Sequence, residues 1–588
     1  MIEAGQTRRL AALAVVTLAI VAIWTSPCWG QGAVAPLMRL LKSGRLPAER
    51  LPKVVEMVCK RGEADDLQYI YEQVIDPQGF SGELRLKALE GLAAAAETRK
   101  VRPEGPPDGL AGLLDEDPAT RLAAVRLAGA WKLEALAQRL RELAISDDSD
   151  QALANAALDA LVQIGEPVAR PVIEPLLAAD RPAARRFRAV AALAKLNPDE
   201  AASRAAEVLE HSGTADPAPL IAAFLGQQGG SERLAAAIAA RRPPADVAKL
   251  SLRAMYALGR GDQVLVDVLT EAAGITADPQ ALTPDEVQEL AAQVTASGDP
   301  ARGEDIFRRN ELNCIKCHAV SGAGGDVGPD LSAVGATSPV DYVINSLLFP
   351  DLAIKEAFVT RIVTTVEGNI FQGIVLDRDE TRLVLKDATG QSVTVPVADV
   401  DEEQEGSSLM PKGITNFLTQ QEFLDLARFV SELGKPGPYG IRSVPTIQRW
   451  RLLSEVPSAL AQSSGDDATP PSELPRHPSV WLPVYAKVAG MLPLDQLATP
   501  EREILWLRAD VDVTSPGAVQ LNLSSTAGIR AWIDGRPLNS GSTCGDLSRG
   551  VHEVLLRVDT RRAESAELRV VVEKAPASTV EYTVVGGP

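Results

Sequence analysis

Apolar positions between about residues 36 and 275 recur with the spacing of helices rather than strands. Alanines in this region recur at intervals of 33, 33, 33 and 32 residues, and a leucine, alanine or glycine follows each one four positions later. Residues i and i+4 share one helical face, so the period predicts stacked helix pairs, an α-solenoid over residues 31–275. The pairs are Ala123 with Leu127, Ala156 with Ala160, Ala189 with Leu193, Ala222 with Gly226, Ala254 with Leu258 and, more loosely, Ala88 with Leu92 and Val55 with Cys59.

Polar or proline-containing breaks separate these units, at residues 115–118, 147–150 and 180–182. The pattern resembles HEAT repeats, in which small residues lie where helices approach closely. Arrays of this kind bury a quasi-linear core and present a curved surface, so we expect docking here rather than catalysis. An irregular Ala-rich helical bundle is the alternative interpretation.

After about residue 480 the pattern changes to short alternating runs, such as 504–507, 519–523 and 551–558. These runs predict a C-terminal all-β sandwich of the jelly-roll type over residues 480–588. A Pro/Gly/Ser-rich linker over 437–479, with or without a first sandwich strand, precedes it. The general resemblance to carbohydrate modules implies carbohydrate as a partner. Trp532, beside the Asp534-Gly535 turn, is either an exposed sugar platform or a core residue.

Helical and alternating patterns mix between residues 276 and 436. Thr283 and Pro284 predict an N-cap and first position of a connecting helix within 276–297. A capping box from Thr419 to Glu422 opens the last helix of a domain at 298–436. Alternating runs at 358–366, 370–376, 383–386 and 393–395 predict four strands, which form a β insert at about 357–400.

The N-terminus carries Arg8 and Arg9, an apolar run over 10–24 and then small residues. This layout predicts a signal peptide over residues 1–30 and a periplasmic or otherwise exported protein. The run has about 15 residues, fewer than the ~20 that span a bilayer, although an uncleaved anchor is the alternative. After signal cleavage, no transmembrane span is expected.

The formal net charge of −19 argues against a nucleic-acid partner and favours cationic or neutral ones. No dinucleotide, flavin or P-loop fingerprint is present. Charge and composition therefore indicate no specific chemistry, and the evidence for function comes from one short motif.

That motif is Cys314-Ile315-Lys316-Cys317-His318, in a chain with only 5 Cys and 4 His. Cys-x-x-Cys-His is the attachment pattern of c-type haem, in which two thiols bind the vinyl groups and the histidine reaches the iron. A redox dithiol would not require the histidine, and a zinc site needs a second ligand pair. We therefore expect one covalently bound haem c, with Cys59 and Cys544 as lone apolar residues.

The residues around the motif resemble class I cytochrome c. Gly303 and Phe307 lie on a short helix before it, and Pro329 follows His318 by 11 residues. The resemblance implies that the Pro329 carbonyl accepts the His318 N–H and that Met410, in a loop before the last helix, is the distal iron ligand. A solvent-capped Met410, with five-coordinate or His-bound iron, is the alternative.

The whole combination resembles the Planctomycete/Verrucomicrobium-type haem-binding domain over about 140 residues. The matching features are the Gly303–Phe307 spacing, the haem motif, Gly-Pro-Asp-Leu at 328–331, the β insert, Ser-Leu-Met-Pro-Lys-Gly at 408–413 and the capping box. The resemblance implies a periplasmic c-type cytochrome module, class I cytochrome c-like with a small β insert.

The function expected from these features is an exported monohaem cytochrome that transfers single electrons between a periplasmic donor and acceptor. One alternative is the electron outlet of a periplasmic carbohydrate-acting oxidoreductase. A second alternative is a haem-containing scaffold or sensor. An electron carrier is favoured over a self-contained enzyme.

Overall fold

The computed structural model describes residues 34–586, apart from 147–149, 277–278, 310, 313, 442–444, 458–459, 462–469, 471–473 and 501. The predicted signal peptide and part of the Pro/Gly/Ser-rich linker therefore lie outside the described residues. The chain divides between Ile275 and Thr276 into two compact units. None of the described helices is both long and apolar enough to cross a membrane.

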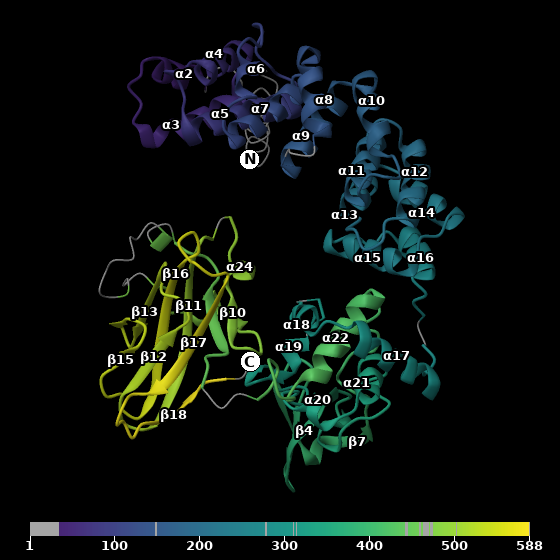
Figure 1. Ribbon diagram of the computed structural model, residues 1–588, viewed down its shortest axis with the longest axis vertical. Coiled ribbons are helices and arrows are strands. Elements are labelled where there is room, and N and C mark those ends of the chain that lie inside the picture. The colour runs from purple at the N-terminus through teal and green to yellow at the C-terminus, as the bar shows by residue number, and fades with distance from the viewer. Residues whose placement is uncertain are drawn as a thin grey trace, which may run out of the picture. The chain divides into compact units, whose positions relative to one another are not determined.

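The first unit is a stack of helix pairs (Figure 1). In each pair, the first helix packs against the first helix of the next pair, in order from α3 through α5, α7, α9, α11 and α13 to α15. The second helices of neighbouring pairs also contact each other, at α8 with α10, α12 with α14 and α14 with α16. The helices are α2 (Ala35–Lys42), α3 (Leu51–Arg61), α4 (Ala64–Ile75), α5 (Gly82–Ala94), α6 (Leu110–Leu113), α7 (Pro118–Ala130), α8 (Ala137–Ile145), α9 (Gln151–Ile164), α10 (Glu166–Leu176), α11 (Ala183–Ala194), α12 (Pro198–Glu210), α13 (Ala218–Leu225), α14 (Gly230–Ala240), α15 (Ala245–Ala257) and α16 (Gln263–Ala272).

The periodic residues of the sequence all fall at the first helix of a pair. Most of them are buried, as expected for the face on which neighbouring pairs stack. The exceptions lie late in the array: Ala222 and Gly226 are exposed, and Leu258 is 47% exposed. Leu258 follows the last residue of α15, where the stack approaches its end and fewer neighbours cover the surface.

The second unit begins with a helical module built on a crossing of two helices, α18 (Pro300–Phe307) and α22 (Gln420–Glu432). Gly303 lies against α22 so closely that a Cβ there would overlap the carbonyl oxygen of Asp425. The rings of Phe307 and Phe429 meet at the same crossing, with centroids 5.5 Å apart. The other helices are α17 (Pro284–Ser297), α19 (Cys314–Cys317), α20 (Val334–Thr337) and α21 (Val340–Leu348).

The N-cap expected at Thr283 and the capping box expected at Thr419 are both present, and the Thr283 cap is also a full capping box. The Thr283 and Glu286 pair opens α17, and the Thr419 and Glu422 pair opens α22. In each, the side chain of one residue binds the backbone N–H of the other, which satisfies donors that a helix start leaves open.

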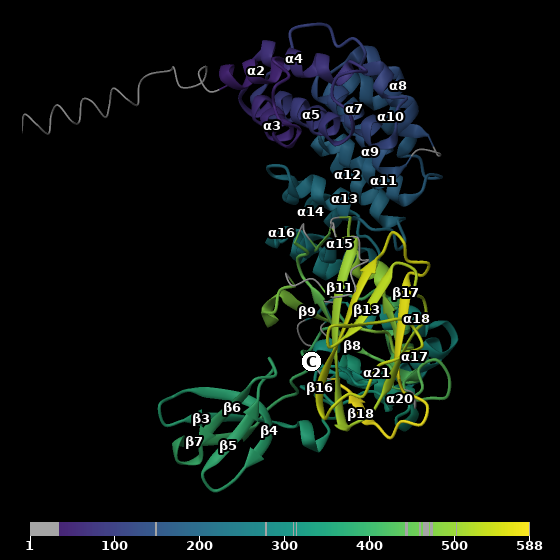
Figure 2. The ribbon, with the colours of Figure 1, turned by 90° about the vertical axis from the view of Figure 1, so that its left-hand side faces the viewer.

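The β insert has five antiparallel strands over the fully described range 360–405, one more than predicted (Figure 2). The strands are β3 (Thr360–Thr365), β4 (Ile370–Arg378), β5 (Arg382–Lys386), β6 (Ser392–Pro396) and β7 (Val400–Glu405), in the order β6-β5-β4-β3-β7. The missed strand β7 has the sequence Val-Asp-Glu-Glu-Gln-Glu, which has no apolar alternation. Its pairing with β3 decides its conformation, and that pairing is not visible in a local pattern.

The C-terminal part of this unit is rich in sheet, as predicted. One sheet has the order β14-β13-β16-β11-β8-β9, with β18 also pairing with β11, and the other has the order β10-β17-β12-β15. The two sheets share one apolar core, to which β11, β13 and β16 contribute from one side and β12 and β17 from the other. The strands are β8 (Arg449–Leu453), β9 (Trp481–Tyr485), β10 (Met491–Pro493), β11 (Ile504–Ser515), β12 (Val519–Leu523), β13 (Ile529–Ile533), β14 (Arg536–Leu538), β15 (Ser542–Thr543), β16 (Gly550–Asp559), β17 (Glu567–Lys574) and β18 (Glu581–Val584), and a short helix α24 (Leu494–Leu497) follows β10.

Trp532 is a core residue of this sheet region and not an exposed platform. Its side chain is 2% exposed and stacks on Trp506, with ring centroids 5.9 Å apart. Of the two interpretations left open for Trp532, the structure therefore supports the core residue, and the sugar platform is excluded because a buried ring face has no room for a pyranose. Carbohydrate binding elsewhere on the sandwich stays a prediction.

His552 on β16 is held between two hydrogen-bond acceptors. Its Nδ1 lies 2.6 Å from the Asp534 carboxylate and its Nε2 lies 2.7 Å from the Ser548 carbonyl oxygen. Neither partner can donate, so both ring nitrogens must carry protons and the imidazolium form fits the site. Burial opposes the charge, but the bonds to Asp534 and Ser548 outweigh it and raise the pKa of His552.

This pair predicts a loss of stability at high pH. The pKa of His552 is higher in the folded chain than the unfolded value of about 6.5, so its contribution is complete below about pH 6.5 and disappears as the pH rises through the folded pKa. The contribution is about 1 kcal/mol for a hydrogen bond of this kind. Urea unfolding followed by Trp fluorescence should show the decline in the full chain, and His552→Gln should abolish it.

The exposed His211 provides the control, since His211→Gln should keep the wild-type pH profile. An identical pH profile in wild type and His552→Gln would contradict the assignment.

Candidate functional site

The Cys-x-x-Cys-His motif forms one helical turn, α19, and the loop after it wraps back over that turn. The His318 N–H donates to the Cys314 carbonyl at 2.8 Å, which closes the turn. The N–H groups of Gly325 and Gly328 then donate to the carbonyls of Ile315 and Cys317, at 2.9 and 2.7 Å. Backbone hydrogen bonds within the turn and from the following loop therefore hold the motif in place.

The imidazole of His318 has a fixed orientation. Its Nδ1 lies 2.8 Å from the Pro329 carbonyl oxygen. A carbonyl only accepts, so Nδ1 donates its proton and Nε2 keeps a free lone pair. Burial lowers the pKa of His318 in spite of this hydrogen bond, which favours the neutral ring. A neutral imidazole with one nitrogen anchored and the other free is the form that binds a metal.

Gly328 makes the close approach of this loop possible. A Cβ at Gly328 would lie 2.5 Å from Cε1 and 2.7 Å from Nδ1 of His318. The backbone thus covers one side of the ring, and the position accepts no side chain without movement.

The two motif thiols are half-buried and not paired in a disulfide. Burial raises the pKa of the Cys314 thiol to about 12 and also raises the pKa of Cys317. Redox dithiols need at least one thiol of lowered pKa, so this environment does not suit that alternative. In the described part of the chain, no three His, Cys, Asp or Glu side chains gather as a metal site would require.

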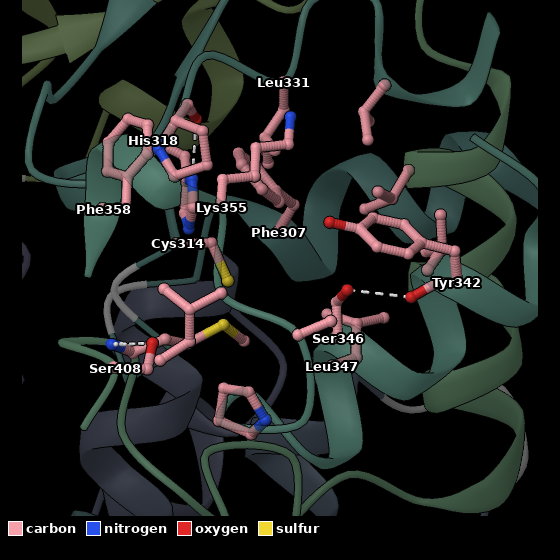
Figure 3. Close-up of a pocket in the computed structure, with 18 residues that line it drawn as sticks. Phe307, Cys314, His318, Leu331, Tyr342, Ser346, Leu347, Lys355, Phe358 and Ser408 are labelled. Atoms are coloured by element: carbon pink, nitrogen blue, oxygen red, sulfur yellow. Dashed lines mark hydrogen bonds between the residues drawn. The ribbon is translucent and has the colours of Figure 1, made fainter. Parts of the chain in front are cut away.

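The structure brings all five residues expected at the site to one place. Two adjoining cavities, of about 150 and 390 Å³, are both lined by Cys314, His318, Pro329 and Met410, and Cys317 lines the larger. Figure 3 shows Cys314 and His318 close together, with Phe307, Leu331 and Phe358 around them. Most of the lining side chains are apolar: Phe307, Leu312, Val327, Leu331, Val334, Val343, Leu347, Ile354, Phe358, Ile374, Leu409, Ile414 and Val430.

Met410 is half-buried in a short segment between β7 and α22. Its N–H donates to the Ser408 hydroxyl at 3.1 Å. Gly413, with a φ of +73°, turns the chain away after Pro411. Met410, 92 residues after His318, thus lines both cavities.

Several lining residues were not expected from the sequence. Tyr342, Ser346 and Leu347 come from α21, and Figure 3 shows them together on that helix. Lys355 and Phe358 come from the segment that leads into β3. The apolar stripe of 340–348 was the available signal for α21, but nothing local indicates that Lys355 faces a cavity.

Comparisons with known proteins identify the helical array. Residues 107–194, from α6 to α11, match the family model for HEAT repeats, which confirms the predicted repeats. No curated protein matches the chain. Among solved structures, the chain is similar to the complex of CpcE and CpcF of phycocyanin lyase from Nostoc sp. PCC7120, with 20% sequence identity and a TM-score of 0.25. That similarity covers 42% of this chain and 96% of the other.

These findings contradict the predicted function, single-electron transfer between periplasmic partners. The family match is to HEAT repeats over residues 107–194 and not to an electron-transfer cytochrome. The error has a physical reason: five residues specify how a haem is attached, whereas electron transfer also needs a partner and a suitable potential. Electron transfer and its two alternatives are therefore withdrawn. At a TM-score of 0.25, the likeness carries no activity over to this chain.

The loop geometry yields a steric prediction. Gly328→Ala should destabilise the second unit by about 1–3 kcal/mol, because the new methyl group forces the loop or the His318 ring to move. Urea unfolding of the full chain measures the effect. Gly545→Ala is the matched control, since its nearest atom beyond its own neighbours, Arg536 Nη1, lies 3.8 Å away. Equal losses in both variants would contradict a special contact at Gly328.

Proposed function

We propose that the module at residues 298–436 binds one haem c covalently, through Cys314 and Cys317, with His318 and Met410 as its axial iron ligands. The observation that carries the proposal is the meeting of these four side chains at one apolar site. The proposal identifies the module as a haem-binding domain of the Planctomycete/Verrucomicrobium type, with a class I cytochrome c-like core.

The residues present fit a haem in three respects. The lining is mostly apolar with aromatic rings, which suits a flat hydrophobic macrocycle. His318 offers a neutral Nε2, and Met410 offers a soft thioether. Polar groups lie among the lining residues, including Tyr342 and the exposed Lys355, which could bind anionic substituents.

The cysteines would attach the group by simple addition. Each thiol adds its S–H across one vinyl double bond: a sulfur–carbon bond forms, the proton goes to the other vinyl carbon, and the double bond becomes single. No group leaves and no oxidant is needed, and both thiols are protonated at neutral pH as this step requires. When bound, the haem supplies an iron with two axial positions and two oxidation states.

Export belongs to the proposal. The apolar run at residues 10–24, preceded by Arg8 and Arg9, has the layout of a signal peptide. Haem is attached covalently to exported chains, so the motif and the leader support one location, the periplasm or its equivalent.

Covalent attachment is tested by expressing the full chain in a host that attaches haem c. Wild type should keep its haem on a denaturing gel, Cys314→Ser and Cys317→Ser should each keep at most one thioether link, and the double variant should lose all covalent haem. Intact mass and haem staining measure this outcome. Cys544→Ser, in the sandwich, is the control and should stain fully. Complete extraction of haem from wild type by acid acetone would reject the proposal.

The distal ligand is tested by Met410→Ala. Oxidised wild type should show the weak long-wavelength sulfur-to-iron charge-transfer band, and the variant should lose the band and bind carbon monoxide when reduced. The reduction potential should fall, because a thioether favours ferrous iron. Met57→Ala, on an exposed position of the HEAT array, should change none of these. An unchanged oxidised spectrum in Met410→Ala would exclude Met410 as a ligand.

A further inference from the structure

The segment that carries Met410 is held by a carboxylate from outside it. The Ser408 N–H donates to Asp351 Oδ1 at 2.7 Å, and the Lys412 ammonium lies 2.9 Å from Asp351 Oδ2. Asp351 follows α21, so one side chain joins the residues two positions before and two positions after Met410.

The β insert holds the same segment at its beginning. Thr360, the first residue of β3, is fully buried, and its hydroxyl donates to the Ser407 carbonyl at 2.7 Å. The Gly406 N–H donates to the Thr360 carbonyl at 2.9 Å. Gln372 on β4 donates to the same hydroxyl at 3.3 Å, which leaves the Thr360 side chain one orientation.

We propose that Asp351 and Thr360 form a latch that positions the Met410 thioether, and that the β insert serves this purpose. This inference rests on the proposed haem site. Asp351 and Thr360 are positioning residues, since neither side chain needs to touch the bound group. Between Gly406 and Gly413 the chain has no helix or ladder of its own, so its ordering depends on these outside contacts.

The backbone contacts are the stronger part of the latch. The Lys412 side chain is 73% exposed, and an exposed ion pair contributes little. A hydrogen bond from the Ser408 N–H to a half-buried carboxylate is charge-assisted and worth more. Burial opposes the charge of Asp351, but the bonds from Lys412 and Ser408 outweigh it and lower its pKa, so the carboxylate is ionised at neutral pH.

The latch is tested with imidazole, which competes with Met410 for the iron and reports how firmly the thioether is held. Imidazole is titrated into the oxidised, haem-loaded full chain, and loss of the sulfur-to-iron band is followed. Asp351→Ala should tighten apparent imidazole binding about tenfold, the ratio that corresponds to one charge-assisted hydrogen bond. Lys412→Ala should shift it less than Asp351→Ala does. Thr360→Val should also tighten apparent imidazole binding, because Thr360 holds the Met410 segment at its beginning.

Asp379→Ala is the matched control. Asp379 also accepts backbone N–H groups, from Thr381 and Arg382, but in the turn that joins β4 to β5. It should lower stability without changing imidazole affinity. If Asp351→Ala does not fold, Asp351→Asn and Thr360→Val provide the same comparison.

The outcomes separate this inference from the proposed haem site. Covalent haem and a normal band, with unchanged imidazole affinity in Asp351→Ala and Thr360→Val, would overturn the latch and leave the haem site standing. Wild type without covalent haem, or without the band, would overturn both. Equal shifts in Asp379→Ala and Asp351→Ala would also overturn the latch, because general loosening would then explain the effect.

Discussion

The crossing of α18 and α22 is the contact on which the site depends. Gly303 and the Asp425 carbonyl meet there without space for a side chain, and Phe307 packs on Phe429 beside them. α18 ends shortly before the cysteine motif, and α22 begins shortly after Met410. This one helix crossing therefore fixes the two chain segments at the site. One segment carries the cysteine motif, and the other carries Met410. If the helices separated, neither segment would keep its place at the cavity.

The crossing also buries a charge, which makes its register specific. Asp425 is 2% exposed, accepts the Asp299 N–H at 2.8 Å and lies 2.7 Å from Arg302 Nε. Burial opposes its charge, but Arg302 and Asp299 outweigh this and lower the pKa of Asp425. Leaving a buried carboxylate without donors is strongly unfavourable, so α18 can dock only where both donors reach it. Packing supplies the attraction at this crossing, and the carboxylate selects one arrangement.

Local signals predicted local features well. The helix starts at Thr283 and Thr419 and the hydrogen bond from His318 to the Pro329 carbonyl each involve residues within about a dozen positions of one another, and the structure has all three. Features decided by distant partners were missed or left open. Strand β7 depends on pairing with β3, and Lys355 reaches the cavity from a segment with no pattern of its own. The sequence left open whether Trp532 is exposed or buried, and its stacking on Trp506 decides the matter.

The long span between His318 and Met410 combines features encoded locally with features that depend on distant partners. The insert lengthens the chain between two residues that line the same cavities, which raises the entropic cost of closing that loop. The insert offsets this cost because it folds around a small core of its own, made of Val363, Leu383, Leu385 and Val395. The Thr360–Ser407 hydrogen bond then holds the end of the insert next to its beginning. The closing distance is then set by a folded element instead of a flexible loop. An inserted sheet of this kind can therefore sharpen the geometry of a site that it does not itself form.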